Sequence, residues 1–278
     1  MKLVENQTFD QEREFYGSDG ITIKKCVFDG EADGESAFKE SKNTVALDCR
    51  MNLRYPFWHN DNLKITNTEF TDKCRAAIWY SKNVSIRSSK LHGIKALREC
   101  MNVSIEDTSV ISTEFGWFVD NINARNSTVS GEYFMFRSSG LNFDSVKLDG
   151  KYSFQYITDS IFENCTFNTK DAFWHDKNVT VRNSVINGEY LAWYAENITF
   201  ENCDIRGTQP LCYCKGLKLI NCRMYDADLS FEKSTVEATV TTPIVSVKNP
   251  LSGYIKAPAI GEMIIDDKDA DCNIEILD

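Results

Sequence analysis

The five tryptophans of this chain stand at one position of a repeating pattern, where they are suited to the recognition of a sugar. They are Trp58, Trp79, Trp117, Trp174 and Trp193. Arg98 occupies the same position in another repeat, and the next position is often polar and aromatic. Its members include His59, Tyr80, His175, Tyr194 and Tyr213. Because aromatic rings stack on the apolar face of a pyranose and polar neighbours bond its hydroxyls, we expect these residues to bind a neutral or weakly charged saccharide.

The same spacing is compatible with two other arrangements. The rings could form an internal stack that fills the fold, or they could be covered by a protein partner or a second copy of the chain. The alternative function is therefore a non-catalytic scaffold that associates with a partner, or with itself as a homo-oligomer, through the aromatic face. The sequence leaves open whether the tryptophans face solvent, the core or a partner.

Three ionisable residues on neighbouring repeats are candidates for acid–base catalysis, namely Asp171, His175 and Glu189. Glycoside hydrolysis uses two carboxyl groups placed across the bond, one protonated and one ionised. Solvated strand ends also collect such residues, so the sequence leaves the question of catalysis open. If the protein is an enzyme, we expect a carbohydrate-active hydrolase or lyase.

A repeat of nineteen residues supplies the elements that must hold these side chains, and three copies follow one another between Thr158 and Cys214. Its fifth and tenth positions are apolar, which is typical of strands with one face inward. Asn or Gly marks the second position, where a tight bend needs left-handed backbone. Because one repeat cannot bury its own apolar face, the copies must stack. We predict an all-β fold, a single-stranded right-handed parallel β-helix with about eleven coils of three short strands.

The repeat also suggests how the chain is divided. We expect an N-terminal cap at residues 1–18, β-helix coils at residues 19–233, and irregular final coils with a C-terminal cap and an acidic tail at residues 234–278. The first coil carries an insertion at residues 31–34, and the third carries a two-residue insertion near Lys73 and Cys74. Insertions in a solenoid become loops on one face, and such loops often flank a binding site.

The charge balance narrows the list of partners and the location. The chain has 41 Asp and Glu against 31 Lys and Arg, which gives a formal net charge of −10. Nucleic acids and anionic membranes reward clustered Lys and Arg, so we expect neither as a partner. No uninterrupted apolar stretch at the N-terminus suits a signal peptide, and no run elsewhere has transmembrane length. We therefore expect a cytoplasmic protein.

The ten cysteines do not form a pattern typical of disulfide frameworks or metal sites. Half of them share one repeat position with Ser and Thr. This position favours a small, poorly solvated side chain, and a free buried cysteine has these properties. Cys212 and Cys214 have no second pair at the spacing of a zinc site. We expect neither a metal nor a cofactor.

Seven segments carry a resemblance to a known family. They are residues 54–59, 93–99, 151–156, 170–175, 188–191, 207–214 and 250–255. Through them the chain resembles, over nearly its whole length, the bacterial family catalogued as domain of unknown function 3737. The resemblance implies a β-helix similar to pectate and pectin lyases, and it brings no established activity.

A fainter resemblance is to polygalacturonase-type glycosidases, whose β-helices carry Asn-Thr-Asp, Asp-Asp and Gly-His-Gly on successive coils. At the corresponding places this chain has Asn168-Thr169-Lys170, Glu189-Tyr190 and Gly207-Thr208-Gln209. The catalytic carboxylates of those enzymes are therefore not retained, which leaves only Asp171, His175 and Glu189 as candidates.

Overall fold

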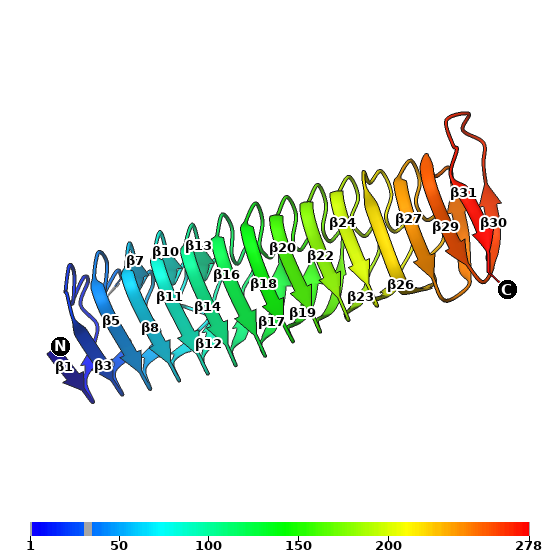
Figure 1. Ribbon diagram of the computed structural model, residues 1–278. Helices are drawn as coiled ribbons and strands as arrows, with labels where there is room; N and C mark the ends of the chain where they lie inside the picture. Colours follow the sequence, from blue (N-terminus) through cyan, green and yellow to red (C-terminus); the bar gives the residue numbers. More distant parts are fainter. Residues whose placement is uncertain (1, 31–34, 278) are drawn as a thin grey trace. The chain divides into compact units, whose positions relative to one another are not determined.

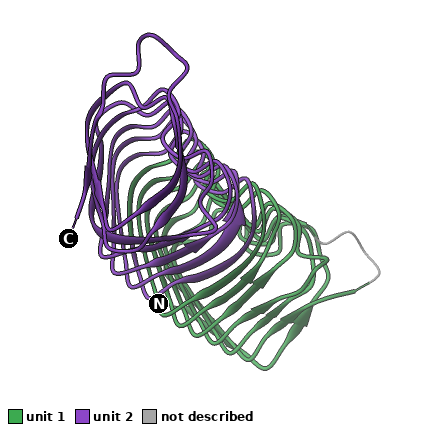
Figure 2. Cartoon of the chain, turned by 90° about the vertical axis from the view of Figure 1, so that its right-hand side faces the viewer, with its two compact units in different colours: residues 1–142 green, residues 143–278 purple. Residues whose placement is uncertain are grey.

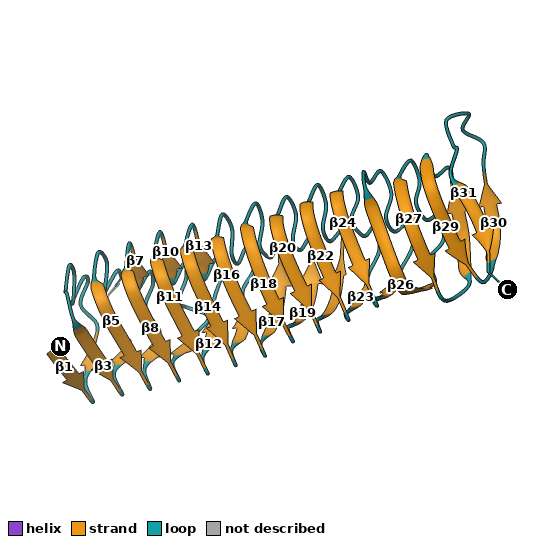
Figure 3. Cartoon of the chain, viewed as in Figure 1, coloured by secondary structure: helices purple, strands orange, loops and turns teal. Residues whose placement is uncertain are grey.

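The computed structural model describes residues 2–30 and 35–277, and every regular element in these residues is a β-strand (Figure 1, Figure 3). The strands pair in parallel from turn to turn, so the fold is a parallel β-solenoid of about 14 turns. The predicted fold class is confirmed. No helix in the described residues has the length and apolar character to span a membrane. The insertion predicted at residues 31–34 lies outside the described residues.

The chain forms two compact units, residues 1–142 and residues 143–278 (Figure 2). In the first unit, the first strands of the turns are β1 (Lys2–Glu5), β3 (Ile21–Lys24), β5 (Lys42–Leu47), β8 (Asp61–Thr66), β11 (Lys82–Arg87), β14 (Met101–Glu106) and β16 (Asp120–Arg125). The second strands are β2 (Thr8–Phe9), β4 (Val27–Phe28), β6 (Arg50–Met51), β9 (Glu69–Phe70), β12 (Lys90–His92), β15 (Ser109–Ile111) and β17 (Thr128–Glu132). The short third strands are β7 (Phe57–Trp58), β10 (Ile78–Trp79) and β13 (Leu97–Arg98).

Strand β18 (Ser139–Asp144) contains the boundary, and the second unit repeats the same plan. Its first strands are β20 (Thr158–Glu163), β22 (Lys177–Arg182), β24 (Glu196–Glu201), β26 (Leu217–Tyr225), β27 (Thr235–Val240), β29 (Ser252–Ala257) and β31 (Asn273–Ile276). The second strands are β19 (Lys147–Lys151), β21 (Thr166–Lys170), β23 (Val185–Asn187) and β25 (Asp204–Arg206). A separate pair joins β28 (Ile244–Lys248) to β30 (Ile260–Ile264).

The number of turns exceeds the predicted eleven because strand pairing continues at both ends of the repeat. At the start, β1 pairs in parallel with β3, and β2 pairs with β4. At the end, β27 pairs with β29, and β29 pairs with β31. Strands β1 and β2 lie within residues 1–18, where a cap was expected, and β27, β29 and β31 lie within residues 234–278, where irregular final coils were expected.

Pairing in register places like residues above one another and builds a continuous core. Val84 of β11 pairs with Val103 of β14. Two residues later, Ile86 pairs with Ile105, and all four side chains are buried. Because successive residues of a strand point to opposite faces, Ser85 between them is exposed. The apolar fifth position of the repeat therefore lies in the interior, as predicted, and the third position lies there with it.

Where asparagine occupies the first bend of a turn, ladders of side-chain amides hold the bend. In the first unit, Asn62 donates to Asn43 at 2.8 Å, and Asn43 donates to Asp19 at 2.7 Å. In the second unit, Asn178 donates to Asp159 at 2.9 Å. A carboxylate only accepts hydrogen bonds, so an aspartate ends each ladder. The two asparagines of the first ladder have φ of 51° and 58°, in the left-handed region that Asn tolerates.

The ten cysteines carry free thiols, and nine of them are buried. Cys203, for example, lies in the predicted cysteine position and donates its thiol to the Val181 carbonyl at 3.4 Å. Burial raises the pKa of the Cys165 thiol to about 11. The prediction that these cysteines serve packing is confirmed. In the described part of the chain, no group of three or more His, Cys, Asp or Glu side chains is arranged to hold a metal ion.

Candidate functional site

The aromatic residues occupy two neighbouring columns. The inner column comprises the half-buried residues Trp58, Trp79, Arg98, Trp117 and Phe136 in the first unit, and Gln155, Trp174 and Trp193 in the second. The outer column comprises His59, Tyr80, Glu99, Phe118 and Arg137 in the first unit, and Tyr156, His175, Tyr194 and Tyr213 in the second. Every outer-column residue has φ between 49° and 61°. This left-handed bend turns the outer column outward and directs the next residue, such as Ser81 or Ala195, back into the core.

The indole N–H groups of the inner column are bonded within the fold. In the first unit, Trp58 donates to the Ala76 carbonyl at 2.8 Å, and Trp79 donates to the Lys95 carbonyl at 2.7 Å. The other three indoles donate to backbone carbonyls in the same way: Trp117 to that of Tyr133 at 2.7 Å, Trp174 to that of Tyr190 at 2.6 Å, and Trp193 to that of Gln209 at 2.7 Å. The tryptophans therefore fasten one turn to the next, and their N–H groups are not available to a ligand.

The faces of the inner-column rings also pack against one another. The rings of Trp58 and Trp79 are stacked with centroids 5.3 Å apart and planes within 1° of parallel. The Arg98 guanidinium lies 5.2 Å from the Trp79 centroid and 5.0 Å from the Trp117 centroid, so it takes the place of a ring in the stack. Stacking of a sugar on open indole faces, as expected from the sequence, is therefore not what this column offers.

The outer column is stacked as well, but its ring edges remain exposed. In the second unit, the ring centroid of His175 lies 4.8 Å from that of Tyr156 and 4.9 Å from that of Tyr194. The centroids of Tyr194 and Tyr213 are also 4.9 Å apart. Both faces of Tyr194 are thus covered, yet the side chain is 44% exposed. A ring covered on both faces exposes its edge, so the hydroxyls and ring edges form the accessible surface. In the first unit, His59 and Tyr80 stack in the same way at 4.9 Å.

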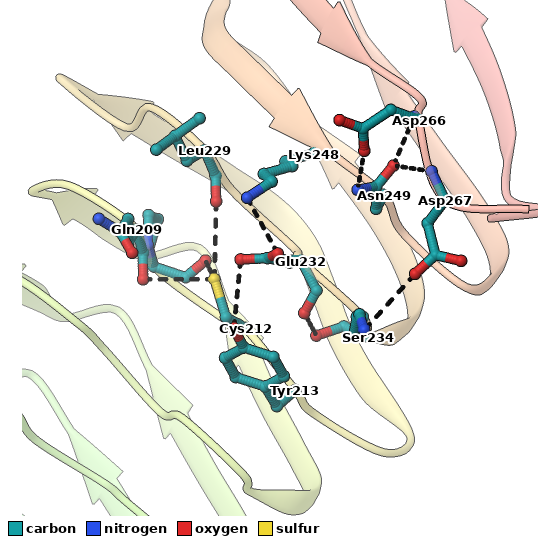
Figure 4. A network of polar contacts seen from close by, with 12 residues as sticks. Gln209, Cys212, Tyr213, Leu229, Glu232, Ser234, Lys248, Asn249, Asp266 and Asp267 are labelled. Atoms are coloured by element: carbon teal, nitrogen blue, oxygen red, sulfur yellow. Dashed lines mark hydrogen bonds and ion pairs between the residues drawn. The ribbon is translucent and has the colours of Figure 1, made fainter. Parts of the chain in front are cut away.

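The outer column of the second unit ends at a network of charged groups (Figure 4). The Tyr213 hydroxyl donates to Glu232 at 3.3 Å, and the Lys248 ammonium lies 3.0 Å from the other Glu232 oxygen. Burial and the Glu232 carboxylate raise the pKa of Tyr213 to about 12, which keeps its hydroxyl a donor. Beyond Glu232, Asn249 donates to Asp266 at 2.6 Å. Glu232, Lys248, Asn249 and Asp266 line a shallow cleft of about 570 Å³ in which cations and carboxylates are largely paired.

Two of the three predicted catalytic candidates are neighbours. Asp171 is buried, and its backbone N–H donates to the Glu189 carbonyl at 2.9 Å. Burial raises the pKa of the Asp171 carboxyl, Lys170 at 3.9 Å lowers it, and the charge of the exposed Glu189 raises it further. His175 belongs to the outer column instead, and no hydrogen bond or ion pair between described residues joins it to either carboxyl group. The structure thus brings together a carboxyl of raised pKa and an exposed carboxylate.

Four members of the outer column, Glu99, Phe118, Arg137 and Tyr156, are not among the predicted site residues, and Phe118 and Tyr156 are the aromatic ones. The exposed fractions of Phe118 and Tyr156, 42% and 40%, match that of Tyr80, at 40%. The signal that identifies them is their repeat position, which they share with the predicted histidines and tyrosines. Glu232 and Lys248 were not predicted as site residues either. Glu232 shares the repeat position of the outer column, whereas Lys248 comes from residues 234–278, where the repeat weakens.

Known proteins with solved structures include several of similar architecture. The A-module of the Azotobacter vinelandii mannuronan C-5 epimerase AlgE4 is 11% identical, with 99% of this chain and 79% of that chain covered and a TM-score of 0.30. The catalytic domain of a GH87 α-1,3-glucanase is 9% identical, with a TM-score of 0.31. The match covers 93% of this chain and 64% of that one, so this chain spans less than two thirds of it. A mutant of the periplasmic alginate epimerase AlgG is 9% identical, with 94% of this chain and 73% of that chain covered and a TM-score of 0.30. These identities are too low to carry an activity over to this chain.

Comparison of the sequence with known families identifies the family of the chain, although no curated protein matches it. A family model described as "Protein of unknown function (DUF3737)" matches residues 2–277. The match covers nearly the whole chain, including the turns that carry both aromatic columns. This protein belongs to the DUF3737 family.

Proposed function

We propose that this protein binds a neutral or weakly charged saccharide along its outer column. The observation that carries the proposal is the exposure of ring edges in a column whose ring faces are already stacked. Tyr80, Tyr156 and Tyr194 are each at least 40% exposed. Their phenol groups can both donate and accept hydrogen bonds, as sugar hydroxyls can.

The spacing of the outer column suits a chain-like ligand. Successive rings from Tyr156 to Tyr213 lie 4.8 to 4.9 Å apart, so polar groups recur at a regular interval along the stack. A ligand with many hydroxyls, lying along this line, would meet a new hydrogen-bonding group at each turn. The formal net charge of −10 disfavours a strongly anionic polymer, which leaves a neutral or weakly charged one.

Chemical modification of the saccharide is a further prediction for the pair of Asp171 and Glu189. The raised pKa of the Asp171 carboxyl favours the protonated form that a general acid requires, and Glu189 is exposed to solvent. A cytoplasmic location, expected from the N-terminal sequence, also remains a prediction.

A screen of neutral and uronate-containing oligosaccharides, followed by calorimetric titration of any ligand found, tests the proposal. We expect Tyr194→Ala to weaken binding about tenfold, equivalent to about 1.4 kcal/mol. Ile161→Ala is the matched control, because Ile161 is 45% exposed in the same unit but lies outside the outer column. Equal affinities for the two variants, or no binding by the intact protein, would contradict the proposal.

Phe118 favours the alternative function, a non-catalytic scaffold for a protein partner. Its side chain is 42% exposed and has no polar group to offer a sugar, and its ring meets Trp117 and Phe136 edge-on at 6.5 and 6.2 Å. Exposed aromatic rings of this kind are frequent in protein interfaces. Sedimentation of the intact protein and of Phe118→Ser distinguishes the two, since self-association that the substitution abolishes would support the scaffold.

A further inference from the structure

The two-residue insertion of the predicted third coil forms an ordered loop after β9 in the first unit. The backbone N–H of Cys74 donates to the Thr71 carbonyl at 3.0 Å, and that of Arg75 donates to the Lys73 carbonyl at 2.8 Å. The Cys74 side chain is completely buried and anchors the loop. Asp72 lies exposed within the turn, and no described residue forms an ion pair or hydrogen bond with its carboxylate. The insertion thus holds a free carboxylate at a fixed place.

The next turn is shaped to receive this loop. Gly93 has a φ of 119°, and a Cβ atom there would lie 2.9 Å from the Cys74 carbonyl oxygen and 3.1 Å from that of Thr71. Any other residue would therefore push the loop outward. Gly131 lies at the same position two turns later, where a Cβ would meet the Ser112 carbonyl oxygen at 2.2 Å. The two glycines keep successive bends in close contact.

A pocket of about 560 Å³ lies beside the loop, and we call it the insertion pocket. Its lining includes Asp72, His92, Ile94, Ile111, Thr113 and Ser130. Ile94 is 39% exposed and Ile111 is 51% exposed, so the pocket contains an apolar patch open to solvent. The volume lies in the range of small-molecule sites, in which a few polar groups surround an apolar surface.

His92 contributes to the pocket a polar ring nitrogen that lacks a hydrogen-bond partner among the described residues. This atom, Nε2, is buried. Buried polar groups without partners are rare and lower stability. A rotation of the imidazole toward the pocket, with a bond from a ligand hydroxyl, would remove that penalty.

We propose that the insertion pocket binds one pyranose ring. Ile94 and Ile111 contact the apolar face of the ring, and the Asp72 carboxylate accepts hydrogen bonds from two neighbouring hydroxyls. No Lys or Arg occurs among the described residues that line the pocket, which excludes a phosphate or a carboxylate as the preferred ligand. This site is separate from the outer column and shares with the proposed function only the class of ligand.

Saturation-transfer NMR on the intact protein tests this inference, with the methyl pyranosides of glucose, galactose, mannose and xylose as probes. We expect at least one probe to receive saturation, and Asp72→Asn and Ile111→Ser each to reduce its signal at least fivefold. Ile220→Ser is the control, since Ile220 is 42% exposed on the second unit and lies outside the pocket. Circular dichroism checks that each variant is folded.

The outcomes separate this site from the outer column. A signal that is lost in Asp72→Asn and kept in Tyr194→Ala supports the insertion pocket, whatever the fate of the outer column. A signal that is lost in Tyr194→Ala and kept in Asp72→Asn and Ile111→Ser overturns the insertion pocket and leaves the proposed function standing. A complete lack of saturation transfer from all four probes also overturns it.

Discussion

The inner and outer columns carry similar rings at adjacent positions, yet they present different surfaces. Trp79 of the inner column is stacked on Trp58, is bonded through its N–H, and lies under Arg98. Tyr194 of the outer column is stacked on both faces but keeps an exposed edge. Each outer-column residue has left-handed backbone and stands between a half-buried inner-column residue and a buried residue. This bend makes the difference between the two columns. Aromatic content alone therefore does not identify a binding surface, whereas the backbone bend does.

The largest effect that separates the columns is expected from Trp79→Ala. The substitution removes a stacked ring and a hydrogen bond to the next turn, so we expect the free energy of unfolding to fall by about 3 kcal/mol. Tyr80→Ala, one residue later, removes an exposed ring that stacks on His59 and meets Trp58 and Trp79 edge-on, and it should cost about 1 kcal/mol. Urea unfolding of both variants measures the difference. Equal losses would mean that the two columns contribute alike and would break the distinction.

The buried position that follows the outer column gives a second test, through Asp176. This side chain is fully buried next to His175, and its Oδ1 accepts the Ile157 N–H at 2.9 Å. Burial raises its pKa well above the ordinary value, while hydrogen bonds from the backbone N–H groups of Ile157 and Tyr156 lower it. No charged side chain contributes to this shift. Between the unfolded pKa and the raised folded pKa, we therefore expect the folded protein to keep a proton that the unfolded chain releases.

The sign of the pH dependence follows from this difference. The contribution of Asp176 to stability is complete below its unfolded pKa of about 4 and falls as the pH rises through the raised folded value. Asp176→Asn should abolish that decline, because Asn60 occupies the same repeat position and donates to the Phe38 carbonyl at 2.8 Å. Melting temperature against pH measures the slope. An identical slope in the variant would show that Asp176 is ionised in the folded state.

The smallest effect concerns the amide ladder, which lies away from both columns. Asn121 donates to Asn102 at 2.8 Å, and Asn102 donates to Asn83 at 3.1 Å. Asn102→Gly keeps the left-handed bend and removes two exposed hydrogen bonds, for an expected loss of about 0.5–1 kcal/mol in unfolding free energy. Asn102→Ala should cost about 1 kcal/mol more, because alanine at a φ of 55° is strained. If the alanine variant is the more stable one, the bend is not left-handed in solution.

The solenoid could be predicted because its cause is local and repeated. Apolar residues at two positions of every coil determine the interior, and Asn or Gly determines the bends. The turn at the N-terminal end could not be predicted, since β1 pairs through backbone groups with few template residues, whereas irregular final coils were expected at residues 234–278. The repeat spacing also predicted the column of tryptophans, but not the direction in which the rings face.

The direction of the inner column depends on a contact between turns that no single repeat reveals. Arg98 and Gln155 occupy tryptophan positions, which suggests an exposed stripe. In the structure these polar residues reproduce the contacts of the indole. Gln155 donates to the Asp171 carbonyl at 3.1 Å, and Arg98 fills a gap in the ring stack. Polar residues at a repeat position are therefore compatible with a structural role when they can bond the neighbouring turn.

Hydroxyl-radical footprinting read by mass spectrometry tests the central distinction most directly. The oxidation rate of each residue, divided by that of the same residue in the urea-unfolded chain, reports its accessibility in one experiment. We predict high ratios for Tyr80, Tyr156 and Tyr194 and ratios several-fold lower for Trp58, Trp79, Trp174 and Trp193. Equal ratios for the two sets, or higher ratios for the tryptophans, would contradict the account, because the indoles would then form the accessible surface.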